Sequence, residues 1–222
     1  ITTDSLVEGV HFLTTDLPQN IAAKLLRVNL SDLAAMGAVP AFYSLAIALP
    51  SNLSASWLEA FSRGLAGDQK EFGITLIGGD TVSSSGPLTL TITAIGFVEK
   101  GAALRRNGAK VGDDIWVSGF IGDGALGLKV AKNDIPKISE KIKKYLLSSY
   151  RTPYPRTLLG PMLVNNVHAA IDISDGLISD LGHICEMSGV GADVQLNGIP
   201  MSFATKQIVT KEANYIDLVL GG

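Results

Sequence analysis

Asp172-Ile173-Ser174-Asp175-Gly176 stands between two segments of different pattern, and this junction decides the fold class. Ala169 to Ile173 is a short apolar run typical of a buried strand. Leu177 to Met187 repeats apolar residues with the period of a helix. A strand that turns directly into a helix is the repeating unit of α/β proteins. Open sheets of that class bind ligands at the carboxyl ends of their strands, where these acidic residues are expected.

The rest of the chain continues this alternation of helices and strands. Asn20 and Ser54 are candidate N-caps, and Gly73 is typical of a helix end. The predicted helices are 20–38, 54–73, 137–149, 156–166 and 177–187, with one more after the glycine-rich turn 119–127 and a last one after Pro200. The predicted strands are 41–49, 74–77, 88–98, 114–118, 169–173 and 194–196. A loop-like segment over 99–112 separates two α/β patterns, so we predict two domains, residues 1–100 and 101–222.

The composition is that of an ordinary globular protein. The chain has 222 residues, of which 46% are hydrophobic and 18% charged, with a net charge of −3. This balance excludes a basic nucleic-acid-binding surface, and no apolar run is as long as a membrane span. A single cysteine, Cys185, allows no intrachain disulfide and predicts a reducing, cytoplasmic location. The chain opens at Ile1 and stops at Gly222, so both ends are expected to be cuts through something longer.

Four short acidic stretches carry the predicted chemistry. Each joins an aspartate to a neighbouring hydroxyl, a glycine or both: Thr2-Thr3-Asp4, Ser31-Asp32, Gly78-Gly79-Asp80-Thr81 and Asp172-Ile173-Ser174-Asp175-Gly176. Carboxylate and hydroxyl oxygens suit Mg²⁺, and glycine or hydroxyl neighbours let a backbone approach phosphate oxygens. If these stretches converge, they can hold a nucleotide through metal ions rather than through basic side chains.

Each of these residues also has a plainer explanation. Asp175 can be a helix N-cap, Asp32 can lie on a solvated helix face, and Asp80 can belong to a turn. His11 can be a core histidine, and Arg106 can be one of a pair of solvated loop arginines or a bidentate phosphate clamp. No Ser-His-Asp arrangement can be argued from the spacing, and Cys185 lies on the apolar pattern of a helix, where a core position is the plainer explanation.

The motifs resemble those of the thiamine-monophosphate kinase family along the whole chain. The matching stretches are residues 2–12, which resemble the family's substrate segment, residues 28–38, Gly78-Gly79-Asp80-Thr81, Arg106-Asn107-Gly108-Ala109 with Gly112-Asp113, and residues 171–177. They follow one another in the family's order. The first, second and last stretches are long enough to be specific.

The resemblance implies the fold of aminoimidazole ribonucleotide synthetase. This fold has an N-terminal α/β domain whose sheet pairs in a homodimer and a C-terminal α/β domain. It implies transfer of the ATP γ-phosphoryl group to thiamine monophosphate with several Mg²⁺ ions. Carried over by motif, the metal ligands are Thr2, Thr3, Asp4, Asp32, Asp80, Asp172 and Asp175, the ATP contacts are Gly79, Asp80, Arg106 and Ser174, and the acceptor contact is His11.

Two other functions stay open from the sequence. One is another ATP-using synthetase of the same superfamily, against which Val7-Glu8-Gly9-Val10-His11-Phe12 argues. The other is a non-catalytic nucleotide-binding or maturation partner. The family's upstream Gly-Asp-Asp and downstream Glu-Asp-Tyr-Glu segments lie outside this chain, which implies that one metal position and part of the thiamine pocket lie outside it too.

Overall fold

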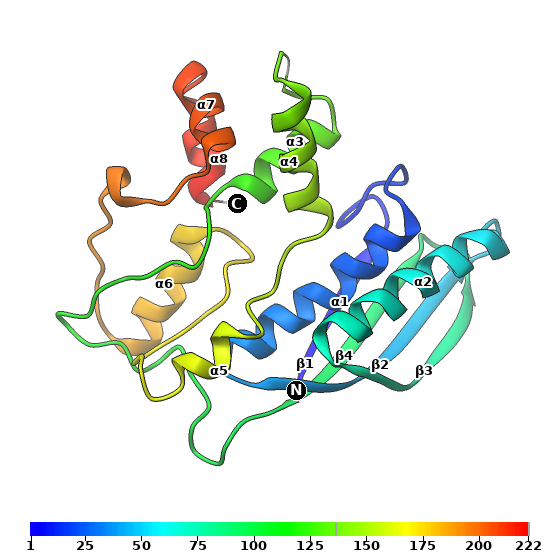
Figure 1. The fold of residues 1–222 in the computed structure, drawn as a ribbon, viewed down its shortest axis with the longest axis horizontal. Coiled ribbons are helices and arrows are strands. Elements are labelled where there is room, and N and C mark those ends of the chain that lie inside the picture. The colour runs from blue at the N-terminus through cyan, green and yellow to red at the C-terminus, as the bar shows by residue number, and fades with distance from the viewer. Residues whose placement is uncertain (136, 222) are drawn as a thin grey trace. The chain divides into compact units, whose positions relative to one another are not determined.

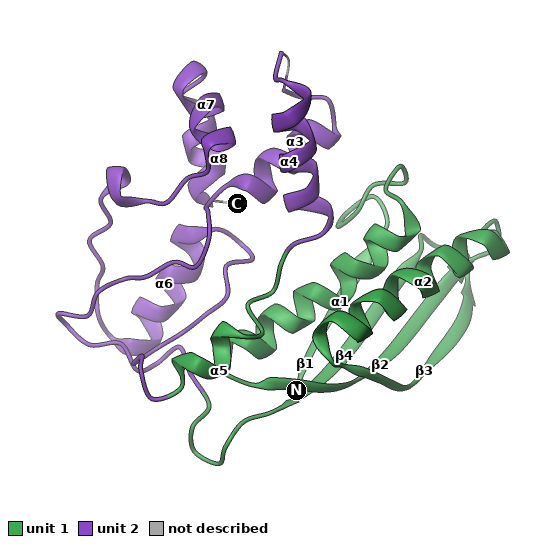
Figure 2. Cartoon of the chain, in the orientation of Figure 1, with its two compact units in different colours: residues 1–103, 154–164 green, residues 104–153, 165–222 purple. Residues whose placement is uncertain are grey.

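The computed structural model describes residues 1–135 and 137–221, and the chain divides into two compact units (Figure 2). Unit 1 comprises residues 1–103 and 154–164, and unit 2 comprises residues 104–153 and 165–222. The segment 154–164 therefore belongs to unit 1, although unit 2 residues flank it in sequence. Among the described residues, no helix combines the length and the apolar character needed to cross a bilayer.

Unit 1 is a mixed four-stranded sheet with helices packed on one face (Figure 1). Its elements are β1 (Thr2–Val7), α1 (Pro18–Ala35), β2 (Val39–Pro50), α2 (Ala55–Phe72), β3 (Thr75–Ser84), β4 (Thr89–Phe97) and α5 (Leu159–Leu163). The strand order is β1-β4-β2-β3, with β2 parallel to β3 and the other pairs antiparallel. The α/β fold class predicted from the sequence is confirmed.

The core of unit 1 lies between α1 and β4. Leu25, Leu26 and Leu30 recur at helical spacing along α1, and each is fully buried. Leu90 and Ile92 alternate along β4 on the face that these leucines cover, and both are also fully buried. Burying a leucine or isoleucine side chain contributes about 1.5–3 kcal/mol, so this contact fixes the helix on the sheet.

The ends of α2 follow the sequence signals, whereas α1 begins earlier than predicted. The Ser54 hydroxyl accepts a hydrogen bond from the Trp57 N–H at 3.2 Å, and Gly73 ends α2 in a left-handed conformation. The prediction of Asn20 as the N-cap of α1 was wrong. Pro18 starts that helix, because its fixed φ suits the first turn and it lacks an N–H that would go unpaired there.

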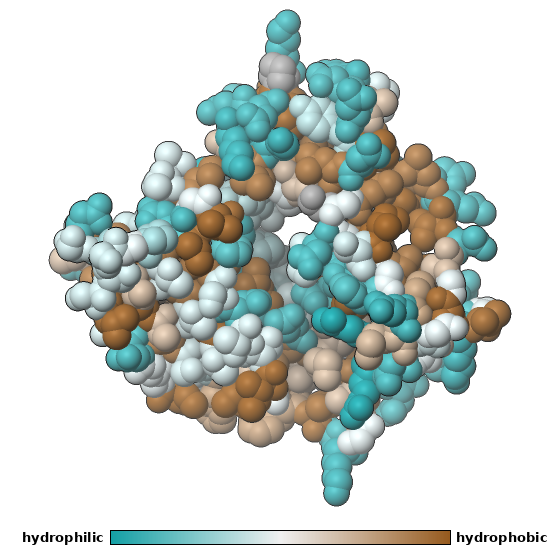
Figure 3. Space-filling model, turned by 180° about the vertical axis from the view of Figure 1, so that it is seen from behind, coloured by the Kyte–Doolittle hydropathy of each residue, from teal (hydrophilic) through white to brown (hydrophobic). Residues whose placement is uncertain are grey.

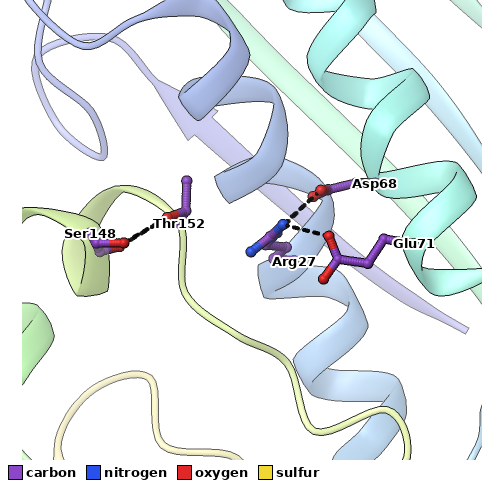
Figure 4. Close-up of polar contacts among 5 residues, drawn as sticks. All are labelled: Arg27, Asp68, Glu71, Ser148 and Thr152. Carbon is purple, nitrogen blue, oxygen red and sulfur yellow. Dashed lines mark hydrogen bonds and ion pairs between the residues drawn. The ribbon is translucent and has the colours of Figure 1, made fainter. Parts of the chain in front are cut away.

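A group of ion pairs around Arg27 joins α1 to α2 (Figure 4). The Arg27 guanidinium donates from Nε and Nη2 to the Asp68 carboxylate at 2.7 and 2.8 Å, and it also reaches Glu71. Asp68 is buried, so this fork-shaped pairing satisfies a charge that would otherwise be costly to bury. The guanidinium also lies 5.2 Å from the centre of the Phe72 ring, which in turn contacts Tyr154. Arg27 is therefore linked through the Phe72 ring to Tyr154, the first residue of segment 154–164.

The other face of the sheet is not covered by helices of unit 1. Phe42, Val82 and Phe97 lie on this face and are exposed, Phe97 to 62%. Between them run small and hydroxyl residues, and the Thr3–Thr93 and Ser5–Thr91 hydroxyl pairs span β1 and β4. Figure 3, which views the molecule from behind, shows weakly polar and hydrophobic residues gathered over the sheet. We call this surface the open face.

Unit 2 is helical in its described residues. It contains α3 (Asp123–Ala131), α4 (Glu140–Arg151), α6 (Leu177–Ser188), a 3-10 turn (Leu196–Gly198), α7 (Phe203–Lys211) and α8 (Tyr215–Gly221). The predicted strands 114–118, 169–173 and 194–196 are not formed, so that prediction was wrong for this structure. A strand needs a ladder of hydrogen bonds to a neighbouring strand, and segment 169–173 is not assigned to any strand, although the Ala170 N–H donates to the Arg105 carbonyl.

Candidate functional site

Thr2, Asp4 and Asp32 form the acidic part of the candidate site in unit 1. Alternation along β1 sends the side chains of Thr2 and Asp4 to the face that carries the buried Leu6, under α1. Asp32 approaches them from the last turns of α1, and its Oδ2 accepts a hydrogen bond from the Thr2 hydroxyl at 2.5 Å. Asp32 therefore turns toward the sheet and not toward open solvent.

The electrostatics of this group favour a bound cation. Burial and the neighbouring charge of Asp32 raise the pKa of Asp4, and the nearby His11 lowers it in part. Two carboxylates and a hydroxyl supply hard oxygen ligands, the kind that Mg²⁺ prefers. Mg²⁺ commonly uses one or two carboxylates and completes its shell with water and phosphate oxygens. The Asp4–Asp32 pair therefore fits a magnesium ion that arrives with a phosphate compound.

Asp80 does not join this pair within unit 1. Asp80 pairs with Ala46 of β2, Ala46 pairs with Thr91 of β4, and Thr91 pairs with Ser5 of β1. Paired residues lie on the same side of a sheet, so all four are on the open face. Two strands separate β1 from β3, a distance of about 14 Å at normal strand spacing. The predicted convergence of Asp80 with Asp4 and Asp32 is therefore not found. Among the described residues, no three acidic, histidine or cysteine side chains are grouped to hold a metal.

A β-bulge decides which face Asp80 occupies. The β2–β3 register shifts between Tyr43 and Ser44, so that Leu76 pairs with Tyr43 but Gly78 pairs with Ser44. Without this extra residue, Asp80 would lie opposite Ile47 and would point toward the helices. The same alternation puts the Thr3 side chain on the open face against Thr93, away from Asp4.

Gly79, the second glycine before Asp80, serves strand packing. The predicted strand ended at Ile77, whereas β3 continues through Gly78 and Gly79 to Ser84. A Cβ atom at Gly79 would lie 1.9 Å from the Leu45 carbonyl oxygen, so a side chain there is excluded by the neighbouring strand. This close approach explains Gly79 without a phosphate, and its predicted ATP contact stays a prediction.

His11 is held in one tautomer at the end of β1. The Val7 N–H donates to His11 Nδ1 at 3.0 Å, so that nitrogen is unprotonated and Nε2 carries the hydrogen. The Lys24 ammonium on α1 donates to the His11 carbonyl at 2.8 Å and fixes the same turn. His11 is exposed and lies near enough to Asp4 to affect its pKa. It therefore presents an N–H donor beside the acidic pair. The plainer explanation of a core histidine does not apply.

Unit 2 brings the Arg106 loop next to the second acidic stretch. The Arg105 carbonyl accepts a hydrogen bond from Ala170 N–H at 3.0 Å, two residues before Asp172. A Cβ atom at Gly108 would lie 1.9 Å from the His168 carbonyl, so glycine is required for this approach. The predicted residues Arg106, Asp172, Ser174 and Asp175 thus belong to adjoining loops of one unit.

A surface ion pair supports the same loop. The His168 Nδ1 lies 2.9 Å from an Asp113 carboxylate oxygen, and the Lys110 N–H donates to Asp113 at 2.8 Å. The Lys110 N–H and the His168 side chain lower the pKa of Asp113. These contacts fasten residues 110–113 to the segment that leads to Asp172.

Sequence reasoning missed Lys24 and Asp180. Lys24 was one polar residue of an amphipathic helix, and its contact with His11 depends on a turn whose path the sequence does not state. Asp180 is a buried carboxylate that accepts hydrogen bonds from the Ser174 and Asp175 N–H groups, at 2.9 and 3.1 Å. Its one available signal was an acidic residue in the first turn of a helix, which is common.

Comparison with known sequences gives a consistent family. Residues 1–98 match the family model described as AIR synthase related protein, N-terminal domain. The thiamine-monophosphate kinase of Haemophilus influenzae is 47% identical over 203 residues, covering 91% of this chain and 60% of that protein. That of Escherichia coli K12 is 47% identical over 212 residues, covering 96% of this chain and 64% of that protein. The chain thus spans less than two thirds of the length of these relatives.

Solved structures agree over the whole chain. The crystal structure of thiamine-monophosphate kinase from Stenotrophomonas maltophilia K279a has a TM-score of 0.92 and 43% identity, and the match covers 100% of this chain and 70% of that one. AaThiL, solved in complex with AMPPCP and TMP, has a TM-score of 0.92 and 30% identity, covering 100% of this chain and 71% of that one.

Replacing Asp32 with Asn tests the acidic pair. The Asn Oδ1 atom can still accept from Thr2, but the repulsion that raises the pKa of Asp4 is removed. In EDTA we expect Asp32→Asn to melt at a temperature equal to the wild type or roughly 1–3 °C higher, the effect of a fraction of a kcal/mol. Excess Mg²⁺ should raise the Tm of the wild type and raise that of the variant by less than half as much. Glu59→Gln on the exposed side of α2 is the control, and equal magnesium responses in all three proteins would exclude the cation site.

The lowered pKa of Lys24 predicts that the stability of the fold depends on pH. Burial lowers the pKa of Lys24 to about 8, and Asp16 opposes part of this shift. Between pH 8 and 10.5 the unfolded chain therefore binds more protons than the folded one, and the unfolding free energy contributed by this residue rises with pH. The full difference is about 3 kcal/mol. Urea unfolding at pH 7.5, 9 and 10 should show the wild type gaining stability relative to Lys24→Met across the series. The exposed Lys70→Met serves as control, and a constant gap between wild type and Lys24→Met would contradict the shifted pKa.

Proposed function

This chain belongs to the thiamine-monophosphate kinase family, and from that membership we propose that it acts in ATP-dependent phosphorylation of thiamine monophosphate to thiamine diphosphate. The observation that carries the proposal is the Asp4–Asp32 pair with the His11 donor beside it. An acidic pair that favours a cation suits two phosphate compounds that repel one another, and AaThiL was solved in complex with AMPPCP and TMP.

The side chains divide the work of positioning the reactants. His11 donates its Nε2 hydrogen to the acceptor phosphate or to a polar group of thiamine. Arg106 and Ser174 of unit 2 contact the ATP phosphates, and the ATP contacts of Gly79 and Asp80 in unit 1 remain predictions from the sequence. Bound Mg²⁺ supplies charge neutralisation to phosphates that would otherwise repel. In unit 1 the residues proposed to hold it are Asp4 and Asp32 with Thr2. Thr3 and Asp80 lie on the open face and are not part of this group, and Asp172 and Asp175 remain predicted ligands in unit 2. No protein nucleophile takes part, so in-line transfer depends on orientation.

We also propose that the protein works as a homodimer through the open face. Phe42 and Phe97 make an edge-to-face contact there, with ring centres 6.4 Å apart, and both are exposed. Exposed aromatic residues grouped on one sheet face are typical of an interface. A second copy on this face would also cover Asp80, the predicted ligand that the β-bulge turns away from Asp4.

An assay with ATP, Mg²⁺ and thiamine monophosphate tests the proposed function and the role of His11 together. We expect ADP and thiamine diphosphate, identified by mass. His11→Ala should raise KM for thiamine monophosphate about ten- to hundredfold, the effect of a lost hydrogen bond to a charged group. The KM for ATP should stay nearly constant, because the lost contact is made with the acceptor.

The exposed His183→Ala is the control for His11→Ala. Turnover of a different acceptor by the wild type would favour another synthetase of the superfamily. The absence of turnover with any acceptor would favour a nucleotide-binding partner. An unchanged KM for thiamine monophosphate in His11→Ala would contradict the proposal that His11 and its segment contact the acceptor.

Sedimentation of the full-length protein tests the dimer. We expect a dimer at micromolar concentration, and Phe97→Glu should shift it to monomer because a charge in the interface core would be buried without a partner. Val111→Glu, at an exposed apolar position of unit 2, should leave the mass unchanged. A wild-type monomer would contradict the proposal, as would a Phe97→Glu dimer as tight as the wild type.

A further inference from the structure

Helix α6 contacts both loops that carry the predicted nucleotide-binding residues of unit 2. At its first turn, Asp180 accepts hydrogen bonds from the Ser174 and Asp175 N–H groups. At its last residue, the Ser188 hydroxyl donates to the Arg106 carbonyl at 2.9 Å and accepts from the Ala109 N–H at 3.2 Å. Eight residues separate Asp180 from Ser188, which sets the two contacts about 12 Å apart along the helix axis.

The Asp180 contact depends on an unusual turn. Gly176 has φ 116° and ψ 154°, a region that is essentially restricted to glycine. This conformation folds the chain back, so that the N–H groups of Ser174 and Asp175 point into the first turn of α6. Asp180 is 3% exposed, and its charge is stabilised by these two donors and by its place near the helix N-terminus. A buried carboxylate with two backbone donors is well fixed.

The same contact determines what the loop offers to solvent. Asp180 occupies the N–H groups of Ser174 and Asp175, while their side chains remain exposed. The loop therefore presents a hydroxyl and a carboxylate and not backbone donors. On the other side, Ser188 satisfies backbone groups on both sides of Asn107 and holds the bend of the Arg106 loop.

We propose that α6 sets the spacing of the two loops, with Asp180 and Ser188 as positioning residues for the nucleotide phosphates and their metal. This inference rests on the proposed function for the identity of the ligand. Neither residue needs to touch the nucleotide. Asp180 acts through Ser174 and Asp175, and Ser188 acts through Arg106.

The test compares Asp180→Leu, Asp180→Asn, Ser188→Ala and Ser188→Thr in the full-length protein. Asp180→Leu removes both acceptor oxygens and should raise KM for ATP by about tenfold or more, with KM for thiamine monophosphate within about threefold of the wild type. Asp180→Asn keeps an oxygen for the two N–H groups, so its KM for ATP should lie between those of the wild type and Asp180→Leu. Ser188→Ala should raise KM for ATP in the same selective way, and Ser188→Thr should restore the wild-type value. Ser179→Ala, exposed on the same helix, is the control.

Amide hydrogen exchange gives a readout independent of turnover. Asp180→Leu should lose protection at Ser174 and Asp175 while the amides of α3 and α4 keep theirs. Titration with AMPPCP and Mg²⁺ measures binding even if the wild type transfers no phosphoryl group, so failure of the proposed function is seen separately. Unchanged ATP affinity in folded Asp180→Asn and Ser188→Ala would overturn the proposal, as would equal losses for both substrates. If Asp180→Leu does not fold, these two variants decide.

Discussion

The burial of α1 against β4 is the contact on which the candidate site of unit 1 depends. Leu25, Leu26 and Leu30 can leave water only if one stripe of the helix meets Leu90 and Ile92. That constraint fixes the rotation of the helix, and the rotation carries Asp32 to the edge of the sheet where Thr2 and Asp4 emerge. The geometry of the acidic pair is therefore a consequence of apolar packing, which holds two carboxylates close together although their charges repel.

Two acidic groups of unit 1 differ in how their charges are compensated. The buried Asp68 has a full partner in Arg27, which donates two hydrogen bonds to it, and this pair joins two helices. For Asp4 and Asp32, by contrast, the neighbours are the Thr2 hydroxyl and the other carboxylate of the pair. Burial and the repulsion between the two carboxylates raise the pKa of Asp4. An acidic pair that lacks such a partner gains from any cation that binds between its members. The contrast points to Asp4 and Asp32 as the site within unit 1.

Backbone anchoring is the common feature of the candidate residues in both units. Val7 and Lys24 fix the turn of His11, Asp180 fixes the turn of Ser174 and Asp175, and Ser188 fixes that of Arg106. In each case the side chain predicted to contact a ligand is exposed at a loop whose main chain is held by a neighbour. Such anchoring lowers the entropy lost when a ligand binds, which suits transfer chemistry that depends on alignment.

The sequence by itself determined several elements of unit 1, and its resemblance to a known family supplied the candidate residues. Helical periodicity and the Ser54 and Gly73 signals located α2, and alternation located β4, because these patterns depend on near neighbours alone. Apolar runs in unit 2 were wrongly predicted as strands, since a strand exists only with a paired neighbour. Tertiary structure alone decided that Asp32 meets Thr2, that a one-residue bulge turns Asp80 to the open face, and that Asp180 holds the acidic loop. These outcomes depend on strand order, register and helix rotation, where a shift of a single residue reverses the face of every side chain that follows.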